Sequence, residues 1–176
     1  MPSIGRVGGP YLCPENTPLA RGQQNVRSRI CEEWGTAMDL DDFIHQCEEA
    51  WQVFVTGDPA PAMLLFSRRN DVTLANPWGP AVTGWAEVSR TLEAAAARFR
   101  GGHLSVFDVR SKFVSGDLAW CHEVERGQAM LGGGSALEDF ALRVTSIYRR
   151  EDGQWRIVLR HADPIVAPRP PDAMLA

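Results

Sequence analysis

The sequence predicts an α+β fold in which helices come first and a run of long antiparallel strands follows. Apolar residues recur at steps of three and four between residues 40 and 55, which is the period of one face of a helix. From residue 104 onward the chain contains four long segments rich in β-branched and aromatic residues, separated by short polar turns. This order is typical of helices that pack on one face of a strongly curved, mainly antiparallel sheet.

Three helices are expected before the long strands. Asp39 can cap the first helix, and Gly57-Asp58-Pro59 ends it. A short second helix is expected over 61–66, and then a strand over 71–75. The third helix is expected from about 85 to 99, where Gly101-Gly102 terminates it. The apolar face of the first helix consists of Leu40, Phe43, Ile44, Cys47, Trp51, Phe54 and Val55.

The second half of the chain is expected to form a sheet of consecutive hairpins. The turn at Glu151-Asp152-Gly153 is the clearest signal, because Asp-Gly readily supplies the positive φ angles of a tight hairpin turn. The expected strands are 104–114, 118–131, 138–150 and 154–163.

Composition excludes several classes of function. The chain has 176 residues, of which 44% are hydrophobic and 23% charged, with a formal net charge of −4. Acids outnumber bases, which argues against a nucleic-acid partner, and no segment approaches the roughly 20 apolar residues needed to span a membrane. Together with the absence of a secretory signal pattern, this predicts a soluble cytoplasmic protein. Neither the cysteines nor the histidines have the spacing of a zinc site, so reduced thiols and no metal are expected.

The chain is expected to divide near residue 38. Residues 1–37 are rich in Gly and Pro and lack an apolar period, so we interpret them as a disordered or arm-like extension. Glu32-Glu33 requires purine-rich codons just upstream of Met38, and this spacing suggests that the native protein starts at Met38. The alternative is a genuine arm that covers a partner subunit. The domain itself is expected over 38–166, followed by a Pro-rich tail over 167–176.

Three segments resemble the SnoaL-like domains of the nuclear transport factor 2-like (NTF2-like, cystatin-like) superfamily, which are relatives of ketosteroid isomerase and polyketide cyclases. These segments are FSRRNDVTLANPWGPAVTGW (66–85), LAWCHEVERG (118–127) and LRVTSIYRREDGQWRIVLRHADP (142–164).

The resemblance implies a cone in which a bent sheet and three helices enclose a mostly apolar pocket. Catalytic members place an Asp, His, Tyr or Glu inside the cone as a general acid or base, and cofactors and metals are usually not needed. The expected partners are a small apolar or polycyclic ligand and a second copy of the chain, packed sheet against sheet.

His161 and Asp163 are one pair of candidate catalytic residues. They lie two apart on the final strand and are expected to share a face with Ile157 and Leu159. An imidazole beside a carboxylate is a tunable base. The alternative is structural, with Asp163 capping the turn at its end of the strand. Many SnoaL-like domains carry a second histidine where this chain has Leu159, and this departure weakens a mechanism with two histidines.

The strand over 118–131 carries a second group of candidate catalytic residues. If the small residues of this strand face the pocket, Glu123 and Glu125 are the inward acids, and burial would raise their pKa values toward the range of a general base. If Trp120 faces the pocket, His122 is the inward base. The sequence leaves both arrangements open.

Arg143 offers a structural alternative for the same strand. It can form an ion pair with Glu125 across the sheet, or it can serve as a cation of the pocket.

Candidate ligand-binding residues lie around the Pro-Gly-Pro loop. Trp78 and Trp85 flank this loop and can stack on a planar ligand, and Asn76 borders it. Alternatively, the two indoles fill the core beneath the loop.

Two classes of function are therefore compatible with the sequence. The first is a small-molecule enzyme of the isomerase, cyclase or dehydratase type that uses general acid–base chemistry in an apolar pocket. The second is a noncatalytic module for ligand binding or oligomer association.

Overall fold

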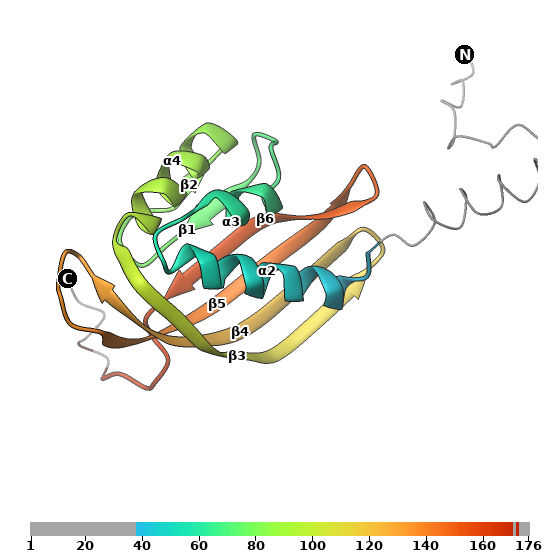
Figure 1. The fold of residues 1–176 in the computed structure, drawn as a ribbon. Coiled ribbons are helices and arrows are strands. Elements are labelled where there is room, and N and C mark those ends of the chain that lie inside the picture. The colour runs from blue at the N-terminus through green and yellow to red at the C-terminus, as the bar shows by residue number, and fades with distance from the viewer. Residues whose placement is uncertain (1–37, 171, 173–176) are drawn as a thin grey trace, which may run out of the picture. The chain divides into compact units, whose positions relative to one another are not determined.

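The structure is a computed structural model, and it describes residues 38–170 and 172. The arm expected over 1–37 lies outside the described residues, so the structure tests neither the arm nor the expected start at Met38. Within it, three helices precede or accompany a single curled sheet of six strands, in the order β2-β1-β6-β5-β4-β3 (Figure 1). Among the paired strands of this sheet, only β1 and β6 run parallel. The α+β class and the mainly antiparallel sheet agree with the sequence prediction.

The helices of this range are α2 (Leu40–Phe54), α3 (Ala60–Leu65) and α4 (Trp85–Ala96). Asp39 caps α2 as predicted, since its Oδ1 accepts a hydrogen bond of 2.8 Å from the Asp42 backbone N–H. Between α3 and α4 lie two short strands, β1 (Thr73–Ala75) and β2 (Val82–Thr83). The sequence analysis did not anticipate β2. None of these helices is long and apolar enough to cross a membrane.

The four long strands are β3 (Phe99–Ser115), β4 (Leu118–Leu131), β5 (Glu138–Glu151) and β6 (Gln154–Asp163). Their bounds agree closely with the prediction for β4, β5 and β6. The Asp-Gly turn between β5 and β6 is confirmed, with φ of 52° at Asp152 and 80° at Gly153.

The predicted boundary between the third helix and the next strand was wrong. The helix ends at Ala96 and β3 already begins at Phe99, so Gly101 and Gly102 lie inside the strand and do not terminate the helix. Phe99 is buried against the rings of Phe54 and Phe140, which draws the start of the strand into the core.

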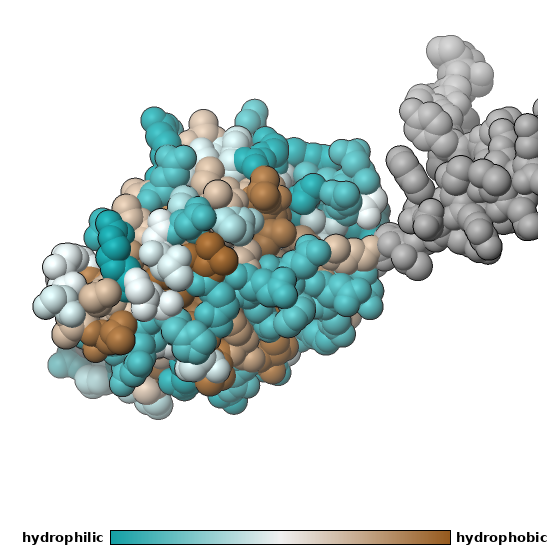
Figure 2. Space-filling model, viewed as in Figure 1, coloured by the Kyte–Doolittle hydropathy of each residue, from teal (hydrophilic) through white to brown (hydrophobic). Residues whose placement is uncertain are grey.

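One face of the sheet, here called the inner face, packs against α2 and carries the core. α2 lies across β3, β4 and β5 in Figure 1, and the ring of Phe43 on α2 meets Tyr148 on β5 with centroids 5.6 Å apart. The helix side of the molecule is mainly hydrophilic on its surface (Figure 2), as expected for amphipathic helices whose apolar stripes face the sheet. The opposite side of the sheet is called the outer face below.

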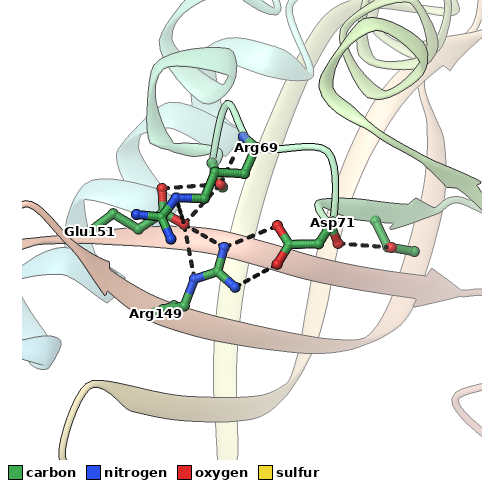
Figure 3. A network of polar contacts seen from close by, with 6 residues as sticks. Arg69, Asp71, Arg149 and Glu151 are labelled. Carbon is green, nitrogen blue, oxygen red and sulfur yellow. Dashed lines mark hydrogen bonds and ion pairs between the residues drawn. The ribbon is translucent and has the colours of Figure 1, made fainter. Parts of the chain in front are cut away.

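A polar network anchors the segment before β1 to the end of β5. The guanidinium of Arg149 on β5 donates to both oxygens of Asp71 at 2.7 and 3.0 Å and to Glu151 at 2.6 Å (Figure 3). Ser67 donates to Glu151 at 2.9 Å. The hydrogen bond from Arg149 lowers the pKa of Asp71. The network fixes the segment that leads into β1, and β1 in turn leads into the loop at residues 76–81.

Gly102 allows β3 to pass close to the end of α2. Its N–H donates to the carbonyl of Val55 at 3.0 Å, and a Cβ at this position would lie 2.2 Å from that same carbonyl oxygen. We therefore expect Gly102→Ala to destabilise the protein by roughly 3 kcal/mol, because a backbone oxygen cannot move aside without breaking this contact. Urea denaturation followed by tryptophan fluorescence measures the change.

Gly79→Ala is the matched control, because a Cβ at Gly79 meets no atom within 4 Å. Equal unfolding midpoints for the two variants would show that the close approach at Gly102 is not a constraint.

Candidate functional site

An apolar pocket opens between the end of α2, the loop after β1, α4 and the inner face of the sheet. Its volume is about 50 Å³, well below the roughly 300–1,000 Å³ of a typical small-molecule site, so a ring-sized ligand requires side chains at the mouth to move. The lining is almost entirely apolar and aromatic. It consists of Trp51, Phe54, Val55, Leu74, Asn76, Pro77, Trp78, Leu92, Ala95, Phe99, Leu104, Glu125, Phe140, Leu142, Arg160 and Ala162.

An ion pair between β4 and β6 is the polar feature of the pocket lining. Nη2 of Arg160 donates to Oε1 and Oε2 of Glu125 at 2.8 and 2.9 Å, and the two residues are only 5% and 2% exposed. Among the described residues, Arg160 forms hydrogen bonds only through Nη2, so Nη1 and Nε remain for an oxygen atom of a ligand. Glu125 likewise keeps lone pairs that Arg160 does not use.

Trp51 on α2 covers this ion pair. The guanidinium carbon of Arg160 lies 4.0 Å from the centroid of the indole, within the range of a cation–π contact. The indole also packs edge-on against Phe54 and Phe66. Trp51 is therefore both a core residue and part of the pocket wall, which limits how Arg160 can move.

The mouth of the pocket is formed by Trp78 in the loop after β1. The Trp78 backbone N–H donates to Oδ1 of Asn76 at 3.0 Å, which shapes the loop, and the indole meets Phe99 with centroids 5.3 Å apart. Trp78 is 40% exposed. A partly exposed aromatic side chain at this position can contact a ligand without first leaving the core.

Glu123 lies on the same face of β4 as Glu125 and is 5% exposed. Its Oε2 is buried and has no hydrogen-bond partner among the described residues. Burial raises the pKa of Glu123 to about 7, the negative charge of Glu125 adds to this effect, and Arg160 partly offsets it. A carboxyl group that exchanges its proton near neutral pH therefore lies two residues from the ion pair.

The groups packed around Glu123 resist ionisation as well. Burial raises the pKa of the Cys47 thiol, and it raises that of Cys121 to about 12. The pKa of Tyr148 is raised for the same reason. Both cysteines are free thiols, and they remain uncharged in this part of the core.

The structure decides which face of β4 meets the pocket. Ala119, Cys121, Glu123 and Glu125 are buried on the inner face, whereas His122 lies on the outer face with its Nδ1 3.0 Å from Oγ1 of Thr145. Of the two arrangements that the sequence left open, the structure has the one in which the acids face inward, and of the two acids Glu125 lines the pocket whereas Glu123 does not.

His161, Asp163 and Arg143 do not reach the pocket. Arg143 pairs with Asp163 on the outer face, with 2.9 Å between Nη2 and Oδ2, so its expected ion pair with Glu125 was wrong. His161 lies 3.8 Å from the same oxygen and is exposed. Burial acts to raise the pKa of Asp163, but hydrogen bonds from the Ile165 N–H and Arg143 outweigh it, and the pKa is lowered.

A β-bulge explains this error. Tyr148 pairs with Ile157 and Ile147 pairs with Leu159, so Val158 is an extra residue in β6. Before the bulge Ile157 faces inward, whereas after it the alternation is reversed. The expected shared face of His161 and Asp163 with Ile157 was therefore wrong, and Arg160 is the residue that turns inward.

Of the two tryptophans expected at the pocket, only Trp78 lines it. The indole of Trp85 instead stacks beneath the guanidinium of Arg68, 3.6 Å from its centroid to the guanidinium carbon. Asn76 does line the pocket. The sequence analysis missed Arg160 and Phe140 as lining residues. The run Ile157-Val158-Leu159, which interrupts strict apolar/polar alternation, was the one local hint of a bulge.

The described part of the chain contains no group of three or more His, Cys, Asp or Glu side chains placed to hold a metal ion. The charged side chains of the pocket lining are the Glu125 carboxylate and the Arg160 guanidinium. A carboxylate can accept a proton, and a guanidinium can donate hydrogen bonds to a carbonyl or enolate oxygen.

Comparison with protein families gives one match. Residues 45–167 match the SnoaL-like domain, which covers well over half of the chain. No curated protein matches the sequence.

Solved structures with the same fold come from several bacteria. A candidate dehydratase of the NTF2-like family from Streptomyces avermitilis is 23% identical, with a TM-score of 0.59, and the match covers 70% of this chain and 94% of that one. A ketosteroid isomerase-like protein from Erwinia carotovora atroseptica is 14% identical, with a TM-score of 0.55 and coverages of 71% and 95%.

A third similar structure is named as an association domain, not as an enzyme. It is a candidate calcium/calmodulin-dependent protein kinase type II association domain from Thiobacillus denitrificans, 20% identical, with a TM-score of 0.55 and coverages of 72% and 94%. At these identities the three structures establish the fold, and they leave the activity open.

The buried carboxyl of Glu123 makes a prediction about stability. Its pKa is about 7 in the folded protein and near 4.5 when exposed, so the folded state binds the proton more tightly. The stabilisation that this proton gives is complete below about pH 4.5 and is lost as the pH rises through 7. Between pH 4.5 and pH 8, the free energy of unfolding of Glu123→Gln should therefore rise by roughly 3 kcal/mol relative to that of the wild type.

Urea denaturation across this pH range measures the difference. Glu49→Gln is the control, because Glu49 is an exposed carboxylate on the same side of the molecule. A Glu123→Gln difference that does not change with pH would show that Glu123 ionises normally.

Proposed function

Since the chain belongs to the SnoaL-like family, we propose that it binds a small, largely apolar molecule in the pocket and moves a proton on it. The observation that carries this proposal is the buried Glu125–Arg160 ion pair at the floor of an otherwise apolar pocket. Burying two charges is costly, and a purely structural core has no need of them where apolar side chains would fill the same space.

The proposed reaction is proton transfer next to a carbonyl group. Arg160 donates hydrogen bonds from Nη1 or Nε to the carbonyl oxygen and stabilises the negative charge that develops there. Glu125 takes the proton from the adjacent carbon and returns it at the same or a neighbouring carbon. Isomerisation, cyclisation and dehydration can all begin with this step. Trp78 and Asn76 contact the ligand at the mouth.

Deuterium exchange tests this chemistry without knowledge of the natural substrate. We expect the wild-type protein to accelerate incorporation of solvent deuterium at the α-carbons of 2-tetralone, a bicyclic ketone, as measured by proton NMR. Glu125→Gln should lower the protein-dependent rate by at least about a hundredfold, because the general base is lost. The amide of Gln still offers an oxygen to Arg160, which favours retention of the fold.

Two further variants make the result specific. Glu125→Asp keeps the charge but shortens the reach, so it should retain the ion-pair partner and lose most of the rate. Glu138 is an exposed residue on β5, and Glu138→Gln should accelerate deuterium incorporation as much as the wild type does. If 2-tetralone broadens in the NMR spectrum of the wild type without any exchange, the protein is a noncatalytic binder. Equal rates for wild type and Glu125→Gln would also exclude Glu125 as the base.

We further propose that two copies of the chain associate through the outer face of the sheet. Four exposed apolar side chains of β3 and β4 support this proposal, and two of them, Phe113 and Leu118, are 56% and 52% exposed. Strand pairing places the four on the outer face, away from α2. The set is Val106, Phe113, Leu118 and Trp120. Exposed apolar clusters of this kind mark interaction surfaces.

Light scattering coupled to size-exclusion chromatography tests the association. We expect the wild type to elute with twice the mass of one chain and the double variant Phe113→Glu/Trp120→Glu to elute as a monomer, because like charges and lost apolar area oppose contact. Leu64→Glu is the control, since Leu64 is exposed on α3 at the helix side. A wild-type monomer would contradict the proposal.

A cytoplasmic location is also proposed. The buried free thiols Cys47 and Cys121 support it, because reducing compartments keep such thiols unpaired.

A further inference from the structure

A surface groove continues from the mouth of the pocket along α4. Asn76, Trp78 and Ala95 line both the pocket and this groove, so the two spaces share a wall. The groove also carries charged side chains on α4 and just after it, namely Glu87, Arg90 and Arg98. A ligand that fills the pocket and extends past Trp78 enters this charged groove.

The two arginines of the groove differ in their partners. Arg90 is held by an ion pair with Glu87, one turn away on α4, and its Nε donates to the carbonyl of Ala86 at 3.3 Å. Arg98 has no carboxylate within ion-pair distance among the described residues. The nearby guanidinium of Arg100 is occupied by the carbonyls of Ala97 and Phe99. Arg98 is therefore the groove cation that a ligand can use without breaking an existing ion pair.

Trp78 links Arg98 to the pocket. The guanidinium carbon of Arg98 lies 5.5 Å from the centroid of the indole, whose edge contacts Phe99 on the pocket side. The stacking restricts where the guanidinium can lie. A cation is thus placed beside Trp78, which forms the mouth of the pocket.

From this arrangement we infer that the ligand is an apolar ring system with an anionic group, and that Arg98 binds this group at the mouth of the pocket. The inference rests on the proposed function and names the substrate class for the same site. Carboxylate, sulfonate and phosphate share the necessary chemistry, since each accepts hydrogen bonds from a guanidinium.

The position of the charge follows from solvation. A free anion at the pocket floor would lose its water and would face Glu125, whose carboxylate repels it and already balances the positive charge of Arg160. At the mouth the anion keeps part of its hydration and is attracted by the positive charge of Arg98. The ligand is therefore oriented with its apolar body and an uncharged oxygen inward.

A pair of fluorescent probes separates charge from apolar burial. 8-Anilinonaphthalene-1-sulfonate and N-phenyl-1-naphthylamine share the same aromatic body, and only the first carries a sulfonate. We expect Arg98→Gln to weaken binding of the sulfonate probe about fivefold and to leave the affinity for the neutral probe unchanged. Raising the salt concentration should shrink the difference between wild type and variant, because the contact is exposed.

Two controls make the effect specific to this position. Arg126→Gln removes an exposed arginine from the outer face and should affect neither probe. Arg98→Lys keeps the charge but loses the planar stacking on Trp78, and it should recover part of the affinity for the sulfonate probe. The inference would be overturned if Arg98→Gln lost affinity equally for both probes, or if it lost affinity for neither.

Displacement by 2-tetralone distinguishes failure of this inference from failure of the proposed function. If the ketone displaces both probes from the wild type and Arg98→Gln still binds the sulfonate probe normally, only the anionic ligand class is wrong. If the ketone displaces neither probe, the probes bind outside the pocket and both the inference and the proposed pocket function fail.

Discussion

The carboxylate of Glu125 is buried beneath the pocket, and the inner face of the sheet depends on Arg160 to neutralise it. A buried carboxylate left without its partner would cost roughly 3–5 kcal/mol. Arg160 reaches Glu125 only because the bulge at Val158 reverses the alternation of β6. The start of the bulge is fixed from outside the hairpin, since the Ser67 N–H donates to the carbonyl of Ile157 at 2.9 Å. The connection after α3 thus helps to set which side chain of β6 enters the pocket.

The same ion pair constrains α2. Trp51 must lie above the guanidinium of Arg160, and the neighbouring Gln52 fixes the rotation of the helix by hydrogen bonds in both directions with the backbone of Leu104 on β3. Because β3 also passes close to the end of α2 at Gly102, the helix is held at two places along its last turns. The pocket walls are therefore positioned by main-chain contacts as well as by apolar packing, which keeps an open cavity from collapsing onto the ion pair.

Sequence patterns were sufficient for features that depend on local geometry. The cap at Asp39 and the turn at Asp152-Gly153 each depend on a few neighbouring residues, and both were predicted correctly. The pocket residues were harder to predict, because the position of the cation depends on which residues of the strand alternate toward the inner face. One inserted residue moves every side chain beyond it to the opposite face. Strict alternation therefore favoured His161 as the inward residue, whereas the bulge brings in its neighbour Arg160.

Burial, together with the need of one guanidinium to serve two buried carboxylates, explains the raised pKa of Glu123. Arg160 binds both oxygens of Glu125, so Glu123 is left with an unpartnered oxygen and a pKa of about 7. Such a group lowers stability at neutral pH, and an apolar residue in its place would avoid this cost. Glu123 does not line the pocket, but its carboxyl lies on the same face of β4 as Glu125, two residues from the ion pair. A destabilising carboxyl so close to the proposed base is a pattern that functional sites show more often than apolar cores do.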